Sequence, residues 1–325
     1  MVAQALPLNT AWPPVVELVV PAATYTSGQV IQLHDGRAGV VTGLRACATG
    51  DTIEVAVAGR YVIAKTTSVV ILRGGRVFWH PLTSLAHFAK QNDRDFYLGT
   101  AANDAASADT TLVVDLNVRQ WETLDMTRDP GTTATVGTAA AEGFGRPKRI
   151  GGSTKFLLTA TNEAQKVDIL GVESIVASGK PIIEVRVNNI TNGSGGSQDF
   201  NIGLASGTNA TDADSITKYV FLHIDGNSLA TNIQSKDGTT TVAATTLASA
   251  LVAGTPFEVW IDCRDLTNVK VYKDGVRVAS GTTIDISQMG STALSLLAHL
   301  EKTSSTDTFE IDVDRAIVRT MQQTA

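Results

Sequence analysis

The sequence predicts an all-β protein in two parts. Short runs of β-branched and aromatic residues recur along the chain and are separated by glycine-containing breaks. Several runs alternate between apolar and polar residues; in Thr52 to Val57, residues Ile53, Val55 and Val57 share one face. A length of 325 residues favours two domains over one.

The composition is that of a globular protein, with 43% hydrophobic and 18% charged residues. The net charge of -6 and the lack of a dense Lys and Arg cluster argue against nucleic acid as a partner. The N-terminus lacks the basic segment of a signal peptide, and its longest apolar stretch, Val15 to Val20, is interrupted by Glu17. We therefore expect no membrane partner.

Residues 1–24 are predicted to form an extended N-terminal arm. Prolines 7, 13, 14 and 21 favour extended backbone. An apolar arm is not expected to lie free in water, so it should lie against its own body or against a neighbouring subunit, with the neighbour favoured. The candidate contact residues of the arm are Trp12, Val15, Val16, Leu18, Val19 and Val20.

Residues 25–118 are predicted to form a small β-barrel domain. Glycine-punctuated strands have the spacing of a small barrel or sandwich, and Ser84 to Lys90 is the one short helical candidate. The domain boundary is placed near Val118 because the following segment, 119–152, changes to Thr, Ala and Gly. That segment is read as a linker that includes the first strands of the second domain.

The second domain, 119–325, is predicted to be an antiparallel β-sandwich with longer strands. Ile182 to Val187 and Phe257 to Cys263 alternate between apolar and other residues. Asp274-Gly275 lies between two apolar runs and supplies the positive φ angles of a tight hairpin turn. Cys47 and Cys263 are far apart in sequence, and both are predicted to be buried thiols.

The strands of the first domain, taken in order, resemble a family of phage capsid decoration, or cement, proteins. The resemblance rests on an ordered series of segments spread over about 90 residues, among them Gly59-Arg60-Tyr61-Val62-Ile63-Ala64-Lys65, Gly75-Arg76-Val77-Phe78-Trp79 and Thr110-Thr111-Leu112-Val113-Val114-Asp115-Leu116. It implies a small trimerising β-barrel that binds the outside of an assembled phage head.

The second domain resembles the concanavalin-type β-sandwich, or jelly roll, of lectins, laminin-G-like modules and some glycanases. The residues that carry this resemblance are Phe257 to Asp262, Val269 to Val276 and the closing strand Phe309 to Val318. Such a fold hosts unrelated functions, so it implies an architecture and no activity.

Two acidic groups in the second domain have alternative interpretations. Glu310, Asp312 and Asp314 share one face of a strand, as glycanase carboxylates do, but a solvated strand face is the favoured explanation. Asp212, Asp214 and Asp225 could bind calcium, although turn chemistry explains them adequately. The five histidines are scattered, and no metal site or cofactor is predicted.

Trp260 is the one candidate ligand platform. It lies on the strand face opposite to Phe257, Val259 and Ile261, which would be the outer face of the sandwich. The favoured alternative is that other parts of the chain cover the ring.

These observations predict a structural virion protein and not an enzyme. The first domain would bind the major capsid protein on the outer capsid surface as a homotrimer, after synthesis in the host cytoplasm, and stabilise the phage head. The sandwich would project outward. The alternative function is a carbohydrate-binding module for adhesion to the host surface or its polysaccharide, and a glycan hydrolase is a third hypothesis.

Overall fold

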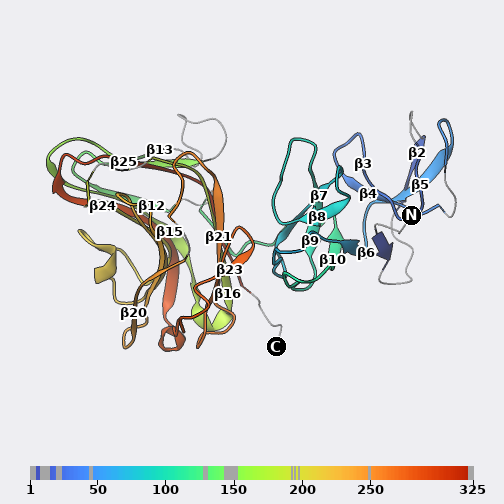
Figure 1. Cartoon of the computed structure of the whole chain (residues 1–325). Helices are drawn as coiled ribbons and strands as arrows, with labels where there is room; N and C mark the ends of the chain where they lie inside the picture. Colours follow the sequence, from blue (N-terminus) through green and yellow to red (C-terminus); the bar gives the residue numbers. More distant parts are fainter. Residues whose placement is uncertain are drawn as a thin grey trace. The chain divides into compact units, whose positions relative to one another are not determined.

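The computed structural model describes residues 5–7, 15–19, 24–43, 47–126, 131–142, 153–191, 193, 195–196, 198–247 and 250–320. The chain divides into two compact units, unit 1 (Met1–Trp121) and unit 2 (Glu122–Ala325), close to the predicted boundary at Val118. Both are built from β-strands (Figure 1). In the described ranges, no helix has the length and apolar character needed to cross a membrane.

The described part of unit 1 contains ten strands in two sheets. They are β1 (Ala5–Pro7), β2 (Val15–Val19), β3 (Val30–Gln32), β4 (Ala38–Val41), β5 (Thr52–Ala56), β6 (Arg60–Ala64), β7 (Arg76–His80), β8 (Leu85–His87), β9 (Phe96–Ala101) and β10 (Thr111–Leu116).

The six-stranded sheet of unit 1 does not close into the predicted barrel. Its order is β1-β6-β10-β9-β7-β8, so β1 and β8 are its edges. One parallel bridge between Lys65 and Ala86 joins the end of β6 to β8 without forming a ladder. β8 has three residues, too few for the staggered register with which a barrel closes. The prediction of a closed barrel is wrong, whereas the all-β prediction is confirmed.

The second sheet of unit 1 has the order β2-β5-β4-β3. Asn117, which follows β10 and has φ +57°, links it to the first sheet. Its side chain accepts a hydrogen bond from the Ala38 amide (2.9 Å) and donates to the carbonyls of Ala38 (2.8 Å) and Val57 (2.7 Å). Three bonds from one side chain thus join β10 to both β4 and the end of β5.

The short helix predicted at Ser84 to Lys90 is wrong. Ser84 has φ +57° in the turn after β7, and Leu85–His87 then pairs with Phe78–His80. Strand pairing provides backbone partners that one isolated helical turn would lack, because the first and last turns of a helix leave their own groups unpaired.

Unit 2 contains two large antiparallel sheets. Its strands are β11 (Leu124–Asp125), β12 (Thr132–Val136), β13 (Ala140–Glu142), β14 (Thr154–Leu158), β15 (Glu163–Val176), β16 (Pro181–Ile190), β17 (Gln198–Ala205), β18 (Tyr219–Asp225), β19 (Thr231–Lys236), β20 (Thr241–Thr246), β21 (Phe257–Asp262), β22 (Lys270–Lys273), β23 (Val276–Val278), β24 (Ala293–Ser305) and β25 (Phe309–Thr320). Short 3-10 helices lie at Ala177–Gly179, Ala213–Ser215 and Ser287–Met289.

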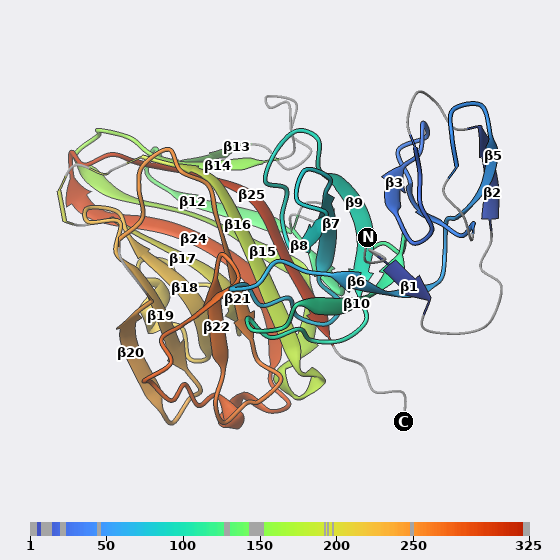
Figure 2. The same ribbon diagram turned by 45° about the vertical axis from the view of Figure 1, so that its right-hand side comes forward.

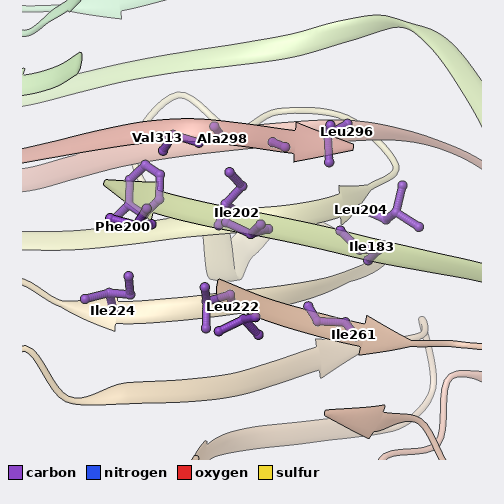
Figure 3. Packing of buried hydrophobic residues seen from close by; sticks show 14 of the residues in the cluster. Ile183, Phe200, Ile202, Leu204, Leu222, Ile224, Ile261, Leu296, Ala298 and Val313 are labelled. Atoms are coloured by element: carbon purple, nitrogen blue, oxygen red, sulfur yellow. The ribbon is translucent and has the colours of Figure 1, made fainter. Parts of the chain in front are cut away.

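The two sheets enclose one apolar core and thereby form the predicted sandwich. The seven-stranded sheet has the order β12-β15-β24-β17-β18-β19-β20, and its strands lie side by side in Figure 2. The eight-stranded sheet has the order β13-β14-β25-β16-β21-β22-β23, and β11 also pairs with β25. Phe200, Ile202 and Leu204 of the first sheet lie across from Ile183 and Ile261 of the second (Figure 3).

Alternation along the strands separates the core from the outer faces, as predicted. Ile183, Val185 and Val187 of β16 belong to the buried core, and Glu184 and Arg186 point to the opposite face.

The predicted hairpin is also present, with β22 paired to β23 and with Asp274 (φ +49°) and Gly275 (φ +77°) in its turn. These angles are those of the two central residues of a type I′ turn.

We expect Gly203→Ala to destabilise unit 2 by roughly 2–4 kcal/mol, because a Cβ at this position would lie 2.1 Å from the Val220 carbonyl oxygen of the neighbouring strand. Gly281→Ala is the matched control, since a Cβ there meets nothing within 4 Å. Chemical denaturation of both variants measures the difference. Equal stabilities would show that the sheet accommodates the methyl group.

Candidate functional site

The described part of the predicted arm lies against its own body. Ala5–Pro7 pairs with β6 at the edge of one sheet, and Val15–Val19 pairs with β5 at the edge of the other. The preference for a neighbouring subunit is therefore not supported for these residues. Trp12 and Val20 lie outside the described residues.

The two faces of β2 differ in what they contact. Val16 and Leu18 point inward and pack against a small core that includes Ile53 and Val55. Val15 (41% exposed) and Val19 (63%) point outward. The candidate contacts Val16 and Leu18 are thus structural, and Val15 and Val19 remain available to a partner.

Two carboxylates lie between these exposed valines. Glu17 of β2 is directly opposite Glu54 of β5, and both residues are exposed. Like charges in directly opposed strand positions repel each other. Among the described residues, no ion pair involves either side chain. The outer side of β2 and β5, formed by Val15, Glu17, Val19 and Glu54, is called the β2 face below.

Two of the three predicted carboxylates of strand β25 form ion pairs. Glu310, Asp312 and Asp314 share one face, as predicted, opposite to the core residues of the strand. Glu310 pairs with Lys155, and Asp314 pairs with Arg186 at 3.4 Å. A hollow of about 400 Å³ adjoins Glu310, but its other lining residues are Leu157, Leu158, Thr159, Thr191, Thr308 and Phe309. It contains no second carboxylate of the kind that a retaining glycosidase uses.

Trp260 is buried, with 5% of its surface exposed. Its indole nitrogen donates a hydrogen bond to Glu258 (2.7 Å), and its ring lies 6.3 Å from that of Tyr272. A ligand platform requires an open ring face, so the interpretation of Trp260 as a platform is not supported. The covered alternative agrees with its position.

The predicted calcium candidates make turn contacts. Asp212 accepts a hydrogen bond from the amide of Asp214 at 2.7 Å, and Asp225 accepts from the amide of Asn227 at 2.9 Å. Among the residues that the structure describes, no group of three or more His, Cys, Asp or Glu side chains could hold a metal ion. Both cysteines are free and buried, as predicted, and burial raises the pKa of the Cys263 thiol.

A lysine fills a set of converging carbonyl oxygens that resembles a cation site. The ammonium of Lys302, whose residue is 4% exposed, donates to the carbonyls of Thr159 (2.7 Å), Thr161 (3.1 Å), Ser305 (2.8 Å) and Asp307 (2.9 Å). Backbone carbonyls are ligands of hard cations. Here the side chain supplies the positive charge and joins the end of β24 to the loop after β14.

The histidines occupy separate environments. His80 Nδ1 lies 2.6 Å from Asp95 Oδ1, and His223 Nδ1 lies 2.8 Å from Asn201 Oδ1. His299 is fully buried on β24, with Nε2 2.9 Å from Glu301 Oε2. Sequence reasoning missed this last group, although His299-Leu300-Glu301 and Lys166-Val167-Asp168 both show alternating charged residues in apolar strands.

Comparison with family models gives a match within the first part of the chain. Residues 12–116 match a family model. This stretch matches the phage cement protein family. The match confirms the resemblance inferred from the ordered strands and covers β2 through β10. No curated protein matches the chain.

Solved structures with a similar fold were found at low similarity. The metal-free carbohydrate recognition domain of Emp46p has 12% identity and a TM-score of 0.38, with 59% of this chain and 88% of that chain covered. The Bacteroides ovatus mixed linkage glucan GH16 structure has 14% identity and a TM-score of 0.39, with 58% and 94% covered. The Bacillus subtilis carbohydrate binding module CBM66 has 11% identity and a TM-score of 0.33, with 56% and 92% covered. These scores carry no argument about function.

Lys302→Met should destabilise unit 2 by about 3 kcal/mol or more, because buried carbonyl groups that lose their donor pay the cost of desolvation. Lys270→Met is the control, since Lys270 is exposed on β22. Thermal unfolding of both variants gives the comparison. If the Lys302 variant unfolds at the wild-type temperature, the ammonium does not hold these loops together.

Proposed function

We propose that the chain is a decoration, or cement, protein of a phage capsid. The observation that carries the proposal is the match of residues 12–116 to the phage cement protein family. Unit 1 binds the major capsid protein on the outer surface of the head, and unit 2 projects from it. In this proposal the protein acts in the virion as a homotrimer.

The β2 face is the proposed contact with the capsid. Val15 and Val19 are among the few large apolar side chains that the described part of unit 1 exposes. Fully burying an exposed valine contributes about 1.5 kcal/mol or more. Because Val15 and Val19 are 41% and 63% exposed, covering both contributes about the equivalent of one valine in each copy. A homotrimer repeats the contact at high effective concentration and thereby raises the avidity.

The paired carboxylates of the β2 face indicate the chemistry of the partner. Glu17 and Glu54 repel each other on the exposed sheet. A Lys or Arg side chain of the capsid protein, placed between them, would remove this repulsion and add charge-assisted hydrogen bonds. The proposed partner surface is therefore apolar with a basic centre.

No observation on unit 2 favours carbohydrate adhesion as a second function. Every aromatic side chain in the described part of unit 2 is buried. Sugar rings are commonly bound against exposed aromatic faces, which here are absent from the described surface. Hydrolysis is likewise not proposed, because two of the β25 carboxylates, Glu310 and Asp314, are paired with cations.

The double variant Val15→Ser, Val19→Ser should bind purified phage heads that lack the protein at least tenfold more weakly than the wild type, because the contact loses apolar area. Co-sedimentation of protein with the heads measures this affinity. Point variants are preferable to deletion of residues 1–20, which would remove β1 and β2 from their sheets.

The control is Val172→Ser, Val276→Ser, which changes two valines of unit 2 that are 69% and 51% exposed. Circular dichroism of both double variants checks that they remain folded. Wild-type affinity of the β2 variant would reject the β2 face but not the capsid role. Failure of the wild type to bind any such head would reject the capsid role itself.

A further inference from the structure

The strand β2 is an edge of the four-stranded sheet of unit 1. It pairs with β5 along its whole length, Val15–Val19, without a register shift, and the two strands lie side by side in Figure 2. In the part of the chain that the structure describes, no backbone hydrogen bond outside this ladder involves β2. A regular edge strand with unpaired backbone groups is a template for the addition of another strand.

The register shows which backbone groups of β2 face outward. The carbonyl of Glu54 on β5 accepts a hydrogen bond from the amide of Thr42, so the backbone groups of Glu54 face away from β2. Glu17 lies directly opposite Glu54. Opposed residues of an antiparallel pair exchange either both of their hydrogen bonds or none, so the backbone groups of Glu17 face away from β5. The same alternation places the N–H and C=O groups of Val15, Glu17 and Val19 along the open edge.

The inner face of β2 is incompletely covered. Val16 and Leu18 pack against the small core that includes Ile53 and Val55. Both β2 side chains stay partly exposed, whereas the two β5 side chains are buried. No strand of the described sheet lies beyond β2 to shield them. An added strand with apolar residues opposite Val16 and Leu18 would extend this core and remove their remaining surface from water.

The charge pattern of β2 distinguishes a second copy of the chain from a different partner. Val15–Val19 has two aliphatic residues on each side of Glu17, so antiparallel pairing of two copies over the whole strand places Glu17 opposite Glu17. Each Glu17 is also opposite Glu54 of its own copy, and the pairing would bring together two carboxylates from each copy. Like charges in directly opposed positions are destabilising. A second copy is therefore a poor occupant of this edge.

We propose that the outer edge of β2 accepts an extended segment of the capsid protein as an additional antiparallel strand. This inference rests on the proposed function, and it changes the β2 face from a side-chain contact into a strand pairing. The segment has a Lys or Arg opposite Glu17 and two apolar residues on each side of it. Its basic side chain lies on the same sheet face as Glu17 and Glu54, and its apolar residues cover the exposed valines and the inner face of β2.

Glu17 has two effects in this arrangement. It keeps free copies from pairing edge to edge, which is how charged residues protect edge strands. It also fixes the register of the capsid segment, because a slip by one residue would move the basic side chain to the opposite face of the sheet. The carboxylate thus opposes self-association in solution and favours one alignment on the capsid.

Replacement of an outward amide separates strand addition from side-chain contact. Val19→Pro removes an N–H that the ladder with β5 does not use, and edge strands tolerate proline at such positions. Val19→Ala shortens the same side chain and keeps the amide. In co-sedimentation with purified heads that lack the protein, Val19→Pro should bind about tenfold more weakly than Val19→Ala, because it loses a backbone hydrogen bond and obstructs the incoming strand. Equal affinity of the two variants overturns strand addition and leaves the capsid role intact.

A charge exchange tests the chemistry of the partner without phage heads. The probe is the labelled peptide acetyl-Ser-Val-Leu-Lys-Val-Val-Ser-amide, and its counterpart has Glu in place of Lys. In fluorescence anisotropy, the full-length wild type should bind the Lys peptide about fivefold more tightly than the Glu peptide, and Glu17→Lys should reverse this preference. Glu173→Lys is the control, because it changes an exposed carboxylate of unit 2 and should keep the wild-type preference.

The outcomes separate the strand pairing from the capsid role. If circular dichroism shows that Val19→Pro does not fold, the peptide preference decides. An unchanged preference in Glu17→Lys, or binding of neither peptide to the wild type, overturns the basic segment as the occupant of the edge. If the wild type binds no heads but shows the reversible peptide preference, the capsid protein is rejected as the source of the segment and the basic strand is supported.

Discussion

The pairing of the last two strands is the constraint on which unit 2 depends. β24 lies between β15 and β17 in one sheet, and β25 lies between β14 and β16 in the other. Each sheet therefore lacks an interior strand until the chain is nearly complete. Val318 of β25 pairs with Leu124, which lies at the beginning of unit 2 in the sequence. Such non-local pairing requires early and late segments to come together before the core is sealed, which slows folding.

The side chains on the inner faces of the sheets are buried in this core. Contacts with a partner or ligand are therefore confined to the outer faces and the ends of the strands. On unit 1 the exposed side of β2 combines two valines with two carboxylates. On unit 2 the outer face of the seven-stranded sheet carries buried charged residues, and two of them, Lys166 and Glu301, hydrogen-bond to the loop between β17 and β18. The two faces differ in kind, because the first is exposed, whereas the second is buried and places Lys166 beside Asp168 and His299 beside Glu301.

Local features of the fold could be predicted from the sequence because their causes are local. Alternation in Ile182 to Val187 and the Asp274-Gly275 turn depend on residues a few positions apart. The environment of His299 could not be predicted, because its neighbours on β15 and β17 are about 100 or more residues away in sequence. The open sheet of unit 1 and the strand at Leu85–His87 were missed because neighbouring strands, not local propensity, decide both.

Because Lys302 takes the place of a bound ion, the loops it joins do not depend on ions in the medium. A bound ion leaves its carbonyl ligands when it is diluted or chelated, whereas the ammonium of Lys302 is covalently part of the chain and cannot be diluted or chelated away. The joint between the end of β24 and the loop after β14 therefore keeps its cation in ion-poor water.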